Sequence, residues 1–150
     1  MAGTYQSLLY HIVFSTKNRE RLISTEIRPR LYEYIGGIIR AEKGVVYAIG
    51  GMPDHVHILA RYRADDAVAN LLRNLKSNSS LWVHKTYPEL RQFAWQTGYD
   101  AFSVSFSQIQ VVNKYISTQE SHHKHRDFCS ELVALLDRHR VEYDPKYVFD

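Results

Sequence analysis

Cysteine, proline and glycine are all scarce in this chain of 150 residues, which contains 1 Cys, 4 Pro and 7 Gly. The single cysteine, Cys129, permits no disulfide within the chain and excludes zinc sites that need several thiolates. The low Pro and Gly content excludes collagen-like and linker-rich chains. Since disulfides cannot contribute to stability, we expect a protein of the reducing cytoplasm.

Long apolar runs are also missing. No stretch approaches the roughly 20 apolar residues that a membrane-spanning helix requires. The first residues, Met1 to Gln6, do not show the charged segment followed by an apolar one that marks a secretory signal. We therefore expect no membrane partner and no export.

What remains is the composition of one globular domain spanning residues 1–150, with 45% hydrophobic and 23% charged residues. A chain of this length buries on the order of 70% of its unfolded surface and can form its own core. Lys and Arg number 19 against 16 Asp and Glu, a formal charge of +3, which permits a polyanionic partner without requiring one. The 8 His and 11 Tyr are the more informative counts.

The apolar pattern predicts the order strand, helix, strand, strand, helix, strand, followed by two more helices. This order is the split β-α-β arrangement of ferredoxin-like folds, an α+β class in which helices cover one face of an antiparallel sheet. A Gly-rich turn over 50–54 is expected to join the second and third strands into a hairpin. The predicted strands are 5–14, 45–49, 55–62 and a β-rich segment at 93–106. The predicted helices run from Ser24 or Thr25 to near Gly44, from Asp65 or Asp66 to near Pro88, from Gln108 to near Ser121 and from Phe128 to near Arg140.

The sequence His55-Val56-His57 places two imidazoles on one side of the third predicted strand, because side chains alternate along a strand. Two imidazoles at this spacing can hold one divalent ion. Two buried histidines satisfied by neighbouring groups are the alternative, and an isolated H-x-H motif does not decide between them. The preceding turn favours the metal site, since it puts the pair at the end of a strand.

Tyr115 and Gln119 are four residues apart in the third predicted helix, so they are neighbours on one helical face. Taken alone, a tyrosine at the rim of an apolar stripe is more often a residue of the core edge. Together with a metal held by two histidines, however, the pair offers a nucleophile, a third ligand and a Lewis acid.

Three motifs resemble the single-tyrosine HUH transposases, small enzymes of bacterial and archaeal insertion sequences that move as single-stranded DNA. They are G-G-M-P-D-H-V-H-I-L at 50–59, W-Q-T-G-Y-D-A-F-S-V-S at 95–105 and V-N-K-Y-I-S-T-Q-E-S-H-H at 112–123. The opening strand followed by S-T-K-N-R-E-R is also similar to the start of that family. The likeness extends from about Tyr5 to Leu136, with the motifs in the family's order.

This resemblance implies that His55, His57 and Gln119 bind Mg²⁺ or Mn²⁺ and that Tyr115 is the nucleophile. The tyrosine would form a 5′-phosphotyrosine link to DNA and free a 3′-hydroxyl, so that rejoining needs no ATP. The physical chemistry is consistent with these roles, because a phenol with a pKa near 10 is a poor nucleophile at neutral pH and a bound cation stabilises the developing charge.

The resemblance further implies a homodimer with active sites shared between subunits, and single-stranded DNA bearing hairpins as the partner. We expect Asp54 to form the turn before His55 and to hold that histidine by a hydrogen bond. Other residues are candidate phosphate contacts, although solvent-exposed surface positions would show the same pattern. They are Lys17, Arg19, Arg21, Arg73, Lys76, His122 and His123.

Three further functions remain open at this point. One is a domesticated relative that nicks chromosomal repeat palindromes, and another is a metal-dependent phosphodiesterase that uses water, with Tyr115 purely structural. The last is a non-catalytic nucleic-acid-binding module on the same ferredoxin-like scaffold, although such a module has no need of H-x-H together with Y-x-x-x-Q.

Overall fold

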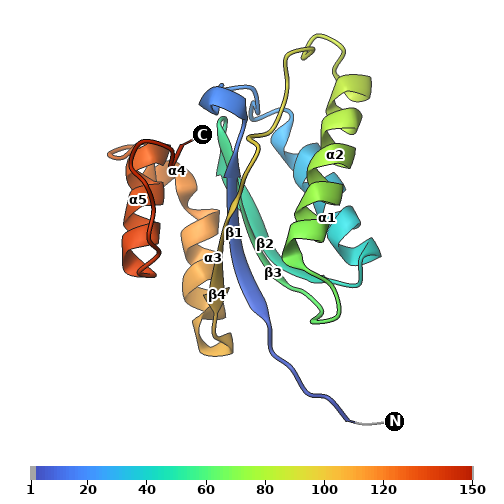
Figure 1. Cartoon of the computed structure of the whole chain (residues 1–150). Coiled ribbons are helices and arrows are strands. Elements are labelled where there is room, and N and C mark those ends of the chain that lie inside the picture. Colours follow the sequence, from blue (N-terminus) through green and yellow to red (C-terminus); the bar gives the residue numbers. More distant parts are fainter. Residues whose placement is uncertain (1–2, 150) are drawn as a thin grey trace.

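Four antiparallel strands form the central sheet of the computed structural model, which describes residues 3–149 (Figure 1). The sheet order is β2-β3-β1-β4, which is the ferredoxin-like order and confirms the α+β class. The strands are β1 (Leu9–Ser15), β2 (Val45–Met52), β3 (His55–Arg61) and β4 (Asp100–Val104).

Helices α1 (Arg28–Ala41) and α2 (Val68–Thr86) cover one face of the sheet (Figure 1). Alternate residues of β1 and β3 point toward these helices and are almost completely buried. This face forms the larger apolar core, in which Ile12, Phe14, Val56, Ile58 and Ala60 of the sheet pack with Leu31, Ile35, Ile39, Leu71, Leu72 and Leu75 of the helices.

The C-terminal helices α3 (Ile109–Ser117), α4 (Gln119–His122) and α5 (Phe128–Arg138) lie on the opposite side of the sheet from α1 and α2 (Figure 1). Asp127 caps α5 by accepting a hydrogen bond from the backbone N–H of Ser130 at 2.9 Å, as expected for an aspartate at this position. A smaller apolar cluster anchors α5 to the sheet through Val13, Phe102, Phe128, Leu132, Leu135 and Leu136.

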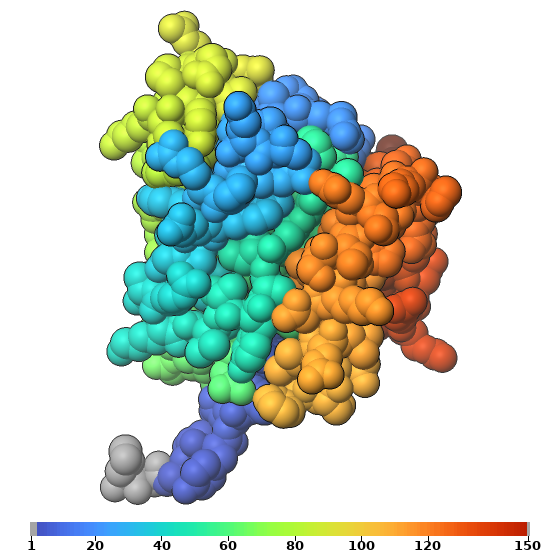
Figure 2. All heavy atoms as spheres, turned by 180° about the vertical axis from the view of Figure 1, so that it is seen from behind, coloured from blue at the N-terminus to red at the C-terminus, as the bar shows by residue number. Residues whose placement is uncertain are grey.

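Figure 2 shows the other side of the molecule, where β2 reaches the surface between α1 and the C-terminal helices. Gly50 lies within β2 rather than in a turn, which corrects the predicted Gly-rich turn over 50–54. A Cβ at this position would lie 2.5 Å from the backbone oxygen of Ile116, so only glycine lets α3 approach this closely. The turn itself contains only Pro53 and Asp54.

The third predicted helix is broken in two. Thr118, with φ −112° and ψ 29°, leaves helical geometry between α3 and α4, and its hydroxyl donates back to the carbonyl of Lys114 at 2.7 Å. Such side-chain bonds compete with the regular helical ladder. Tyr115 and Gln119 therefore belong to two different helices, although they remain neighbours.

Other predicted boundaries shift by a few residues. The first helix begins at Arg28 rather than at Ser24 or Thr25, and the second follows Ala67 because Asp66 instead accepts hydrogen bonds from Tyr62 and Asn70. The segment 93–106 contains regular strand only in β4, plus one bridge from Trp95 to Thr16. Within residues 3–149, no helix combines the length and apolar character needed to cross a membrane.

Candidate active site and metal centre

Strand alternation places His55 and His57 of β3 on the face of the sheet covered by the C-terminal helices. Val56 and Ile58 point the other way into the larger core. Both histidines have an exposed fraction of 0%, so their ring nitrogens must find partners inside the protein.

Each of these imidazoles is held through its Nδ1 atom. The Nδ1 of His55 donates to Oδ1 of Asp54 at 2.7 Å, and the Nδ1 of His57 lies 2.8 Å from Nε2 of His11 in β1. Hydrogen bonds of this kind fix the ring orientation of metal-binding histidines and direct the other nitrogen to the ion. The two Nε2 atoms therefore point into one shared space.

Burial and these contacts also shift the pKa values of His11 and His55. Burial and the neighbouring His57 lower the pKa of His11 to about 3, so this ring is neutral. Burial alone would lower the pKa of His55, but hydrogen bonds with Asp54 and Glu131 raise it to about 9. His55 thus lies between two carboxylates, which favour its protonated form.

Glu131 of α5 reaches the centre of the space between the imidazoles, with an exposed fraction of 1%. Its Oε1 lies 3.3 Å from Nε2 of His55, 3.1 Å from Nε2 of His57 and 3.1 Å from Nε2 of His123. Burial alone would raise its pKa, but hydrogen bonds from His55 and His57 hold it well below the usual range. The carboxylate is therefore ionised.

Tyr115 and Gln119 complete this cluster. The Tyr115 hydroxyl donates to Oε2 of Glu131, and the Gln119 amide donates to the same oxygen at 3.0 Å. The amide oxygen of Gln119 lies 3.0 Å from Nε2 of His55. Burial and the adjacent negative charge of Glu131 raise the pKa of Tyr115 above its ordinary value of 10, so the phenol is protonated at neutral pH.

The chemistry of the donors fits a divalent cation. Candidate ligand atoms of His55, His57 and Glu131 lie within 4.8 Å of one another, and the Gln119 oxygen is adjacent. Carboxylate and amide oxygens suit Mg²⁺ and Mn²⁺, while imidazole suits transition metals such as zinc, copper, iron and nickel. The group of residues expected from the sequence is thus brought together in one chain, with Glu131 added.

Two hollows flank the cluster. One, of about 330 Å³, is lined by Tyr115, His11, Arg138 and His139 among others. The other, of about 570 Å³, lies against His123 and Asp54 and carries three basic side chains: Arg21, His125 and Arg126. The larger hollow also contains Asp54 and Asp127, and its three basic side chains could contact a phosphate-bearing ligand.

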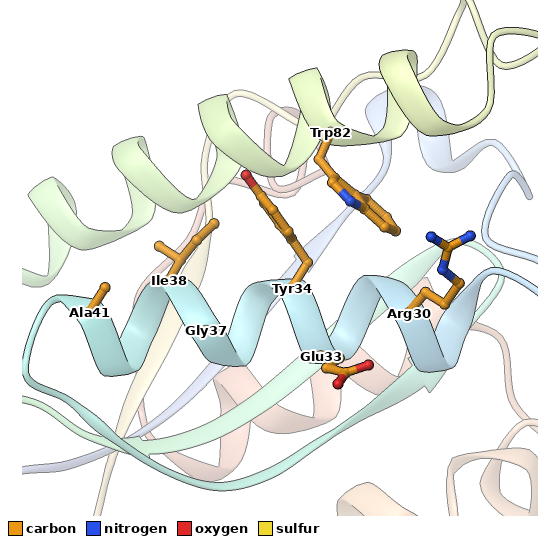
Figure 3. A pocket seen from close by; sticks show the side chains of 7 residues that line it. All are labelled: Arg30, Glu33, Tyr34, Gly37, Ile38, Ala41 and Trp82. Atoms are coloured by element: carbon orange, nitrogen blue, oxygen red, sulfur yellow. The ribbon is translucent and has the colours of Figure 1, made fainter.

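A third hollow is unrelated to the histidines. It has a volume of about 470 Å³ and lies between α1 and α2, on the other side of the sheet (Figure 3). The rings of Tyr34 and Trp82 stack there with centroids 5.1 Å apart, and Arg30 lies 5.8 Å from the Trp82 ring centroid. No cluster of metal-ligating groups lines this groove.

The remaining sequence candidates have different surroundings. Lys17 and Arg73 are exposed, whereas the Arg19 guanidinium donates to the carbonyl of Phe149 at 3.0 Å. Lys76 donates to the carbonyls of Gln96 and Gly98 and thereby fixes a loop. Their contact with DNA stays a prediction, and Lys76 and Arg19 already have partners within the fold.

The two histidines after the tyrosine helix differ from each other. The ring centroid of His122 lies 4.5 Å from that of Tyr115. His123 joins the cluster, with its Nε2 3.1 Å from both Gln119 Oε1 and Glu131 Oε1. His123 therefore lies beside the candidate metal ligands and also lines the larger flanking hollow, and its contact with DNA stays a prediction.

The family model described as "Transposase IS200 like" matches residues 4–119 of this chain. The chain belongs to the IS200-like transposase family. A relative of this transposase, the ISDra2 transposase TnpA of Deinococcus radiodurans, is 26% identical over 122 residues, covering 78% of this chain and 87% of the relative.

Solved structures share the transposase fold. A crystal structure of a Deinococcus radiodurans protein assigned as a transposase has a TM-score of 0.66 at 24% identity, over 79% of this chain and 95% of the other. A REP-associated tyrosine transposase bound to a REP hairpin has a TM-score of 0.61 at 17% identity, over 82% of this chain and 74% of the other.

Sequence reasoning missed two residues of this site, His11 and Glu131, and gave a third, His123, a different role. His11 is buried in the apolar first strand, and only the pairing of Val13 with His57 in β1 and β3 brings it beside the histidine pair. His123 was favoured as a phosphate contact. Glu131 belongs to an ordinary amphipathic helix, where its position on the apolar face, beside Leu132 and Leu135, was the one available signal.

Proposed function

We propose that this IS200-like transposase cleaves and rejoins single-stranded DNA through a covalent bond between Tyr115 and a 5′-phosphate, with a divalent cation. One observation carries the proposal. The Tyr115 hydroxyl lies in the same buried cluster as His55, His57 and Gln119, which together offer a nucleophile and metal ligands in one place.

His55, His57 and Gln119 would hold Mg²⁺ or Mn²⁺, with Asp54 and His11 fixing the two imidazoles. When bound, the cation polarises the scissile phosphate and stabilises its developing negative charge. The Tyr115 hydroxyl gives up its proton as its oxygen attacks phosphorus, and the bond from phosphorus to the 3′ oxygen breaks. That oxygen takes up one proton as a 3′-hydroxyl, so no net proton is consumed. The reverse step, by another 3′-hydroxyl, rejoins DNA without an external energy source.

The substrate would be single-stranded DNA with hairpins at the ends of the mobile element. Tyr115 and Glu131 line a small opening together with the exposed Arg126 and Arg138. Two guanidinium groups at this opening provide the positive charge that a phosphate approaching Tyr115 requires. The REP hairpin bound by a structural neighbour supports a hairpin ligand for this chain.

A homodimer is part of this proposal. β2 and β4 form the two edges of the sheet among the described residues, and an unpaired edge can pair with another copy of the chain. Tyr115 nevertheless contacts the histidines of its own chain. In a dimer with shared sites, the helix that carries Tyr115 would have to leave these histidines and contact those of the other subunit. The reaction would take place in the cytoplasm, at the DNA of a bacterium or archaeon.

A second candidate is a domesticated enzyme that nicks repeat palindromes, which is favoured by the likeness to a REP-associated transposase. The same chemistry would serve both functions. Flanking DNA distinguishes them, because a mobile copy lies between subterminal palindromes and a domesticated copy does not.

The proposal is tested by incubating the protein with a labelled single-stranded hairpin oligonucleotide and Mg²⁺, followed by a denaturing gel. We expect a protein–DNA adduct with the wild type, none with Tyr115→Phe and none after chelation. Tyr87→Phe is a matched control at a tyrosine away from the cluster. Adduct formation by Tyr115→Phe would contradict the nucleophile assignment, and cleavage without any adduct would indicate a hydrolase that uses water.

A further inference from the structure

Helix α5 lies beyond the residues that the family model matches, because that match ends at Gln119 and α5 begins at Phe128. Its apolar residues pack on Val13 and Phe102 of the sheet, which holds the helix against the histidine face. From this helix, Glu131 enters the centre of the cluster. The carboxylate therefore lies outside the residues that the family model matches.

The first oxygen of Glu131 has the surroundings of a metal ligand. Oε1 lies 3.1 to 3.3 Å from the Nε2 atoms of His55 and His57, the two atoms that their Nδ1 contacts direct inward. The carboxylate has an exposed fraction of 1%, so its oxygens are enclosed among these groups. A carboxylate oxygen is a ligand that suits Mg²⁺ and Mn²⁺.

The second oxygen of Glu131 faces the nucleophile. Oε2 accepts hydrogen bonds from the Tyr115 hydroxyl and from the Gln119 amide. The Gln119 amide oxygen is thereby turned toward His55 Nε2, at 3.0 Å. One carboxylate thus contacts both the candidate ligands and the side chain expected to attack DNA.

We propose that Glu131 is an additional protein ligand of the divalent ion and that its second oxygen positions the Tyr115 hydroxyl. This inference rests on the function proposed above and extends it to α5. The C-terminal helix then forms part of the metal centre, beyond its role as a cover packed on the sheet.

Metal binding without DNA tests the ligand role. We expect Glu131→Gln, which keeps the size of the side chain but removes its charge, to weaken Mn²⁺ binding at least about 10-fold in calorimetric titration. Glu142→Gln changes an exposed carboxylate of the same C-terminal segment and should bind Mn²⁺ like the wild type. Thermal melts verify that both variants fold. Unchanged Mn²⁺ affinity in folded Glu131→Gln would overturn the ligand role.

The positioning role is tested by the rate of adduct formation against Mn²⁺ concentration. Glu131→Gln keeps an oxygen that can accept from Tyr115, so we expect a higher half-saturating Mn²⁺ concentration and recovery of most of the rate at saturation. Glu131→Ala has no acceptor, and its rate should stay at least about 10-fold low at saturating Mn²⁺. Equal maximal rates for these two variants would overturn positioning. If the alanine variant does not fold, Glu131→Leu, which is closer in size and also has no acceptor, replaces it under the same criterion.

A different role for Glu131 gives the opposite result. If the carboxylate merely blocked the site and had to withdraw before DNA entered, its removal would leave Mn²⁺ affinity unchanged or tighter and would accelerate adduct formation. The ligand role of Glu131 and the proposed function can also be rejected independently of each other. Mn²⁺ binding that depends on Glu131, in a protein that never forms an adduct, would reject the proposed function and keep the ligand.

Discussion

The two faces of the sheet are built from the same strands but have opposite chemistry. Along β3, Val56, Ile58 and Ala60 contact α1 and α2 in an apolar core, while His55 and His57 meet polar groups beneath the C-terminal helices. Both sets of side chains are almost completely buried. Burial therefore does not distinguish the face that stabilises the fold from the face that carries the candidate site.

The difference lies in what satisfies the buried groups. Apolar side chains are stabilised by removal from water and by close packing. The histidine face instead uses a continuous network, in which His11, His55, His57, Gln119 and Glu131 each contact another member. A buried network of this kind is stable only when each polar group keeps its hydrogen-bond partner. Single substitutions on the two faces should therefore have different effects on the protein.

The largest effect is expected from His57→Ala on the polar face. Loss of one imidazole ligand should abolish DNA adduct formation, a decrease of more than about 100-fold, and should remove detectable Mn²⁺ binding in the folded protein. Gel assays and calorimetry measure the two effects. Adduct formation at the wild-type rate by this variant would remove His57 from the metal site.

The adjacent residue on the apolar face, Ile58, provides the matched contrast. Ile58→Ala should lower the free energy of unfolding by about 2–5 kcal/mol, because it leaves a cavity among fully buried residues. The protein that remains folded should bind Mn²⁺ with wild-type affinity. Chemical denaturation measures stability, and a selective loss of metal binding without destabilisation would contradict the division between the faces.

Addition of metal should stabilise the wild type and not His57→Ala. At a free Mn²⁺ concentration about 100 times the Kd, the stabilisation is about 2.7 kcal/mol, because the ion binds the folded state. Thermal melts with Mn²⁺ and with chelator measure this shift. An equal shift in His57→Ala would indicate binding of Mn²⁺ elsewhere on the protein.

His11 tests whether the network extends to β1. His11→Phe fills a similar volume but cannot contact Nδ1 of His57, so Mn²⁺ affinity should decrease by about 10-fold while the fold is kept. Calorimetry on the folded variant measures the change. His84→Phe, at a histidine that instead contacts the carbonyl of Phe93, serves as the control and should leave the affinity unchanged.

The smallest effect concerns Asp100 of β4, which lies near Lys76 of α2. Burial raises the pKa of Asp100 to about 6, and Lys76 only partly offsets this. In the unfolded chain this carboxyl titrates near pH 4, so the free energy of unfolding contributed by Asp100 falls as the pH rises from about 4 to about 6.

Asp100→Asn lacks this titration, so its melting temperature relative to the wild type should be higher at about pH 7 than at about pH 4. Melts of both proteins at the two pH values measure the difference. A difference that is the same at both pH values would show that the pKa of Asp100 is not raised by folding.

Much of this arrangement could be predicted because it depends on local periodicity. Alternation along β3 correctly separated His55 and His57 from Val56 and Ile58, and the order of elements gave the ferredoxin-like sheet. The motif around Tyr115 suggested the polar cluster, although the break at Thr118 was not foreseen. The Thr118 hydroxyl shares the Lys114 carbonyl with its own backbone N–H at this break, and helical spacing alone carries no signal for it.

The parts that could not be predicted depend on contacts between distant segments. The side chain of Glu131 is 12 residues beyond Gln119 in the chain but reaches it through the packing of α5. Gly50 likewise allows the close approach of Ile116 in α3, a role that its interpretation as a turn residue did not include. Periodicity identifies which face of an element is buried but does not reveal what lies opposite.

Mass spectrometry of a trapped adduct tests the central claim most directly. The protein is incubated with Mg²⁺ and a single-stranded hairpin substrate nicked so that rejoining is prevented, then digested with nuclease and trypsin. The account predicts a nucleotide remnant joined through its 5′-phosphate to Tyr115, in the peptide from Tyr115 to Lys124. A remnant on another residue, or cleaved DNA with a free 5′-phosphate and no modified peptide, would contradict it.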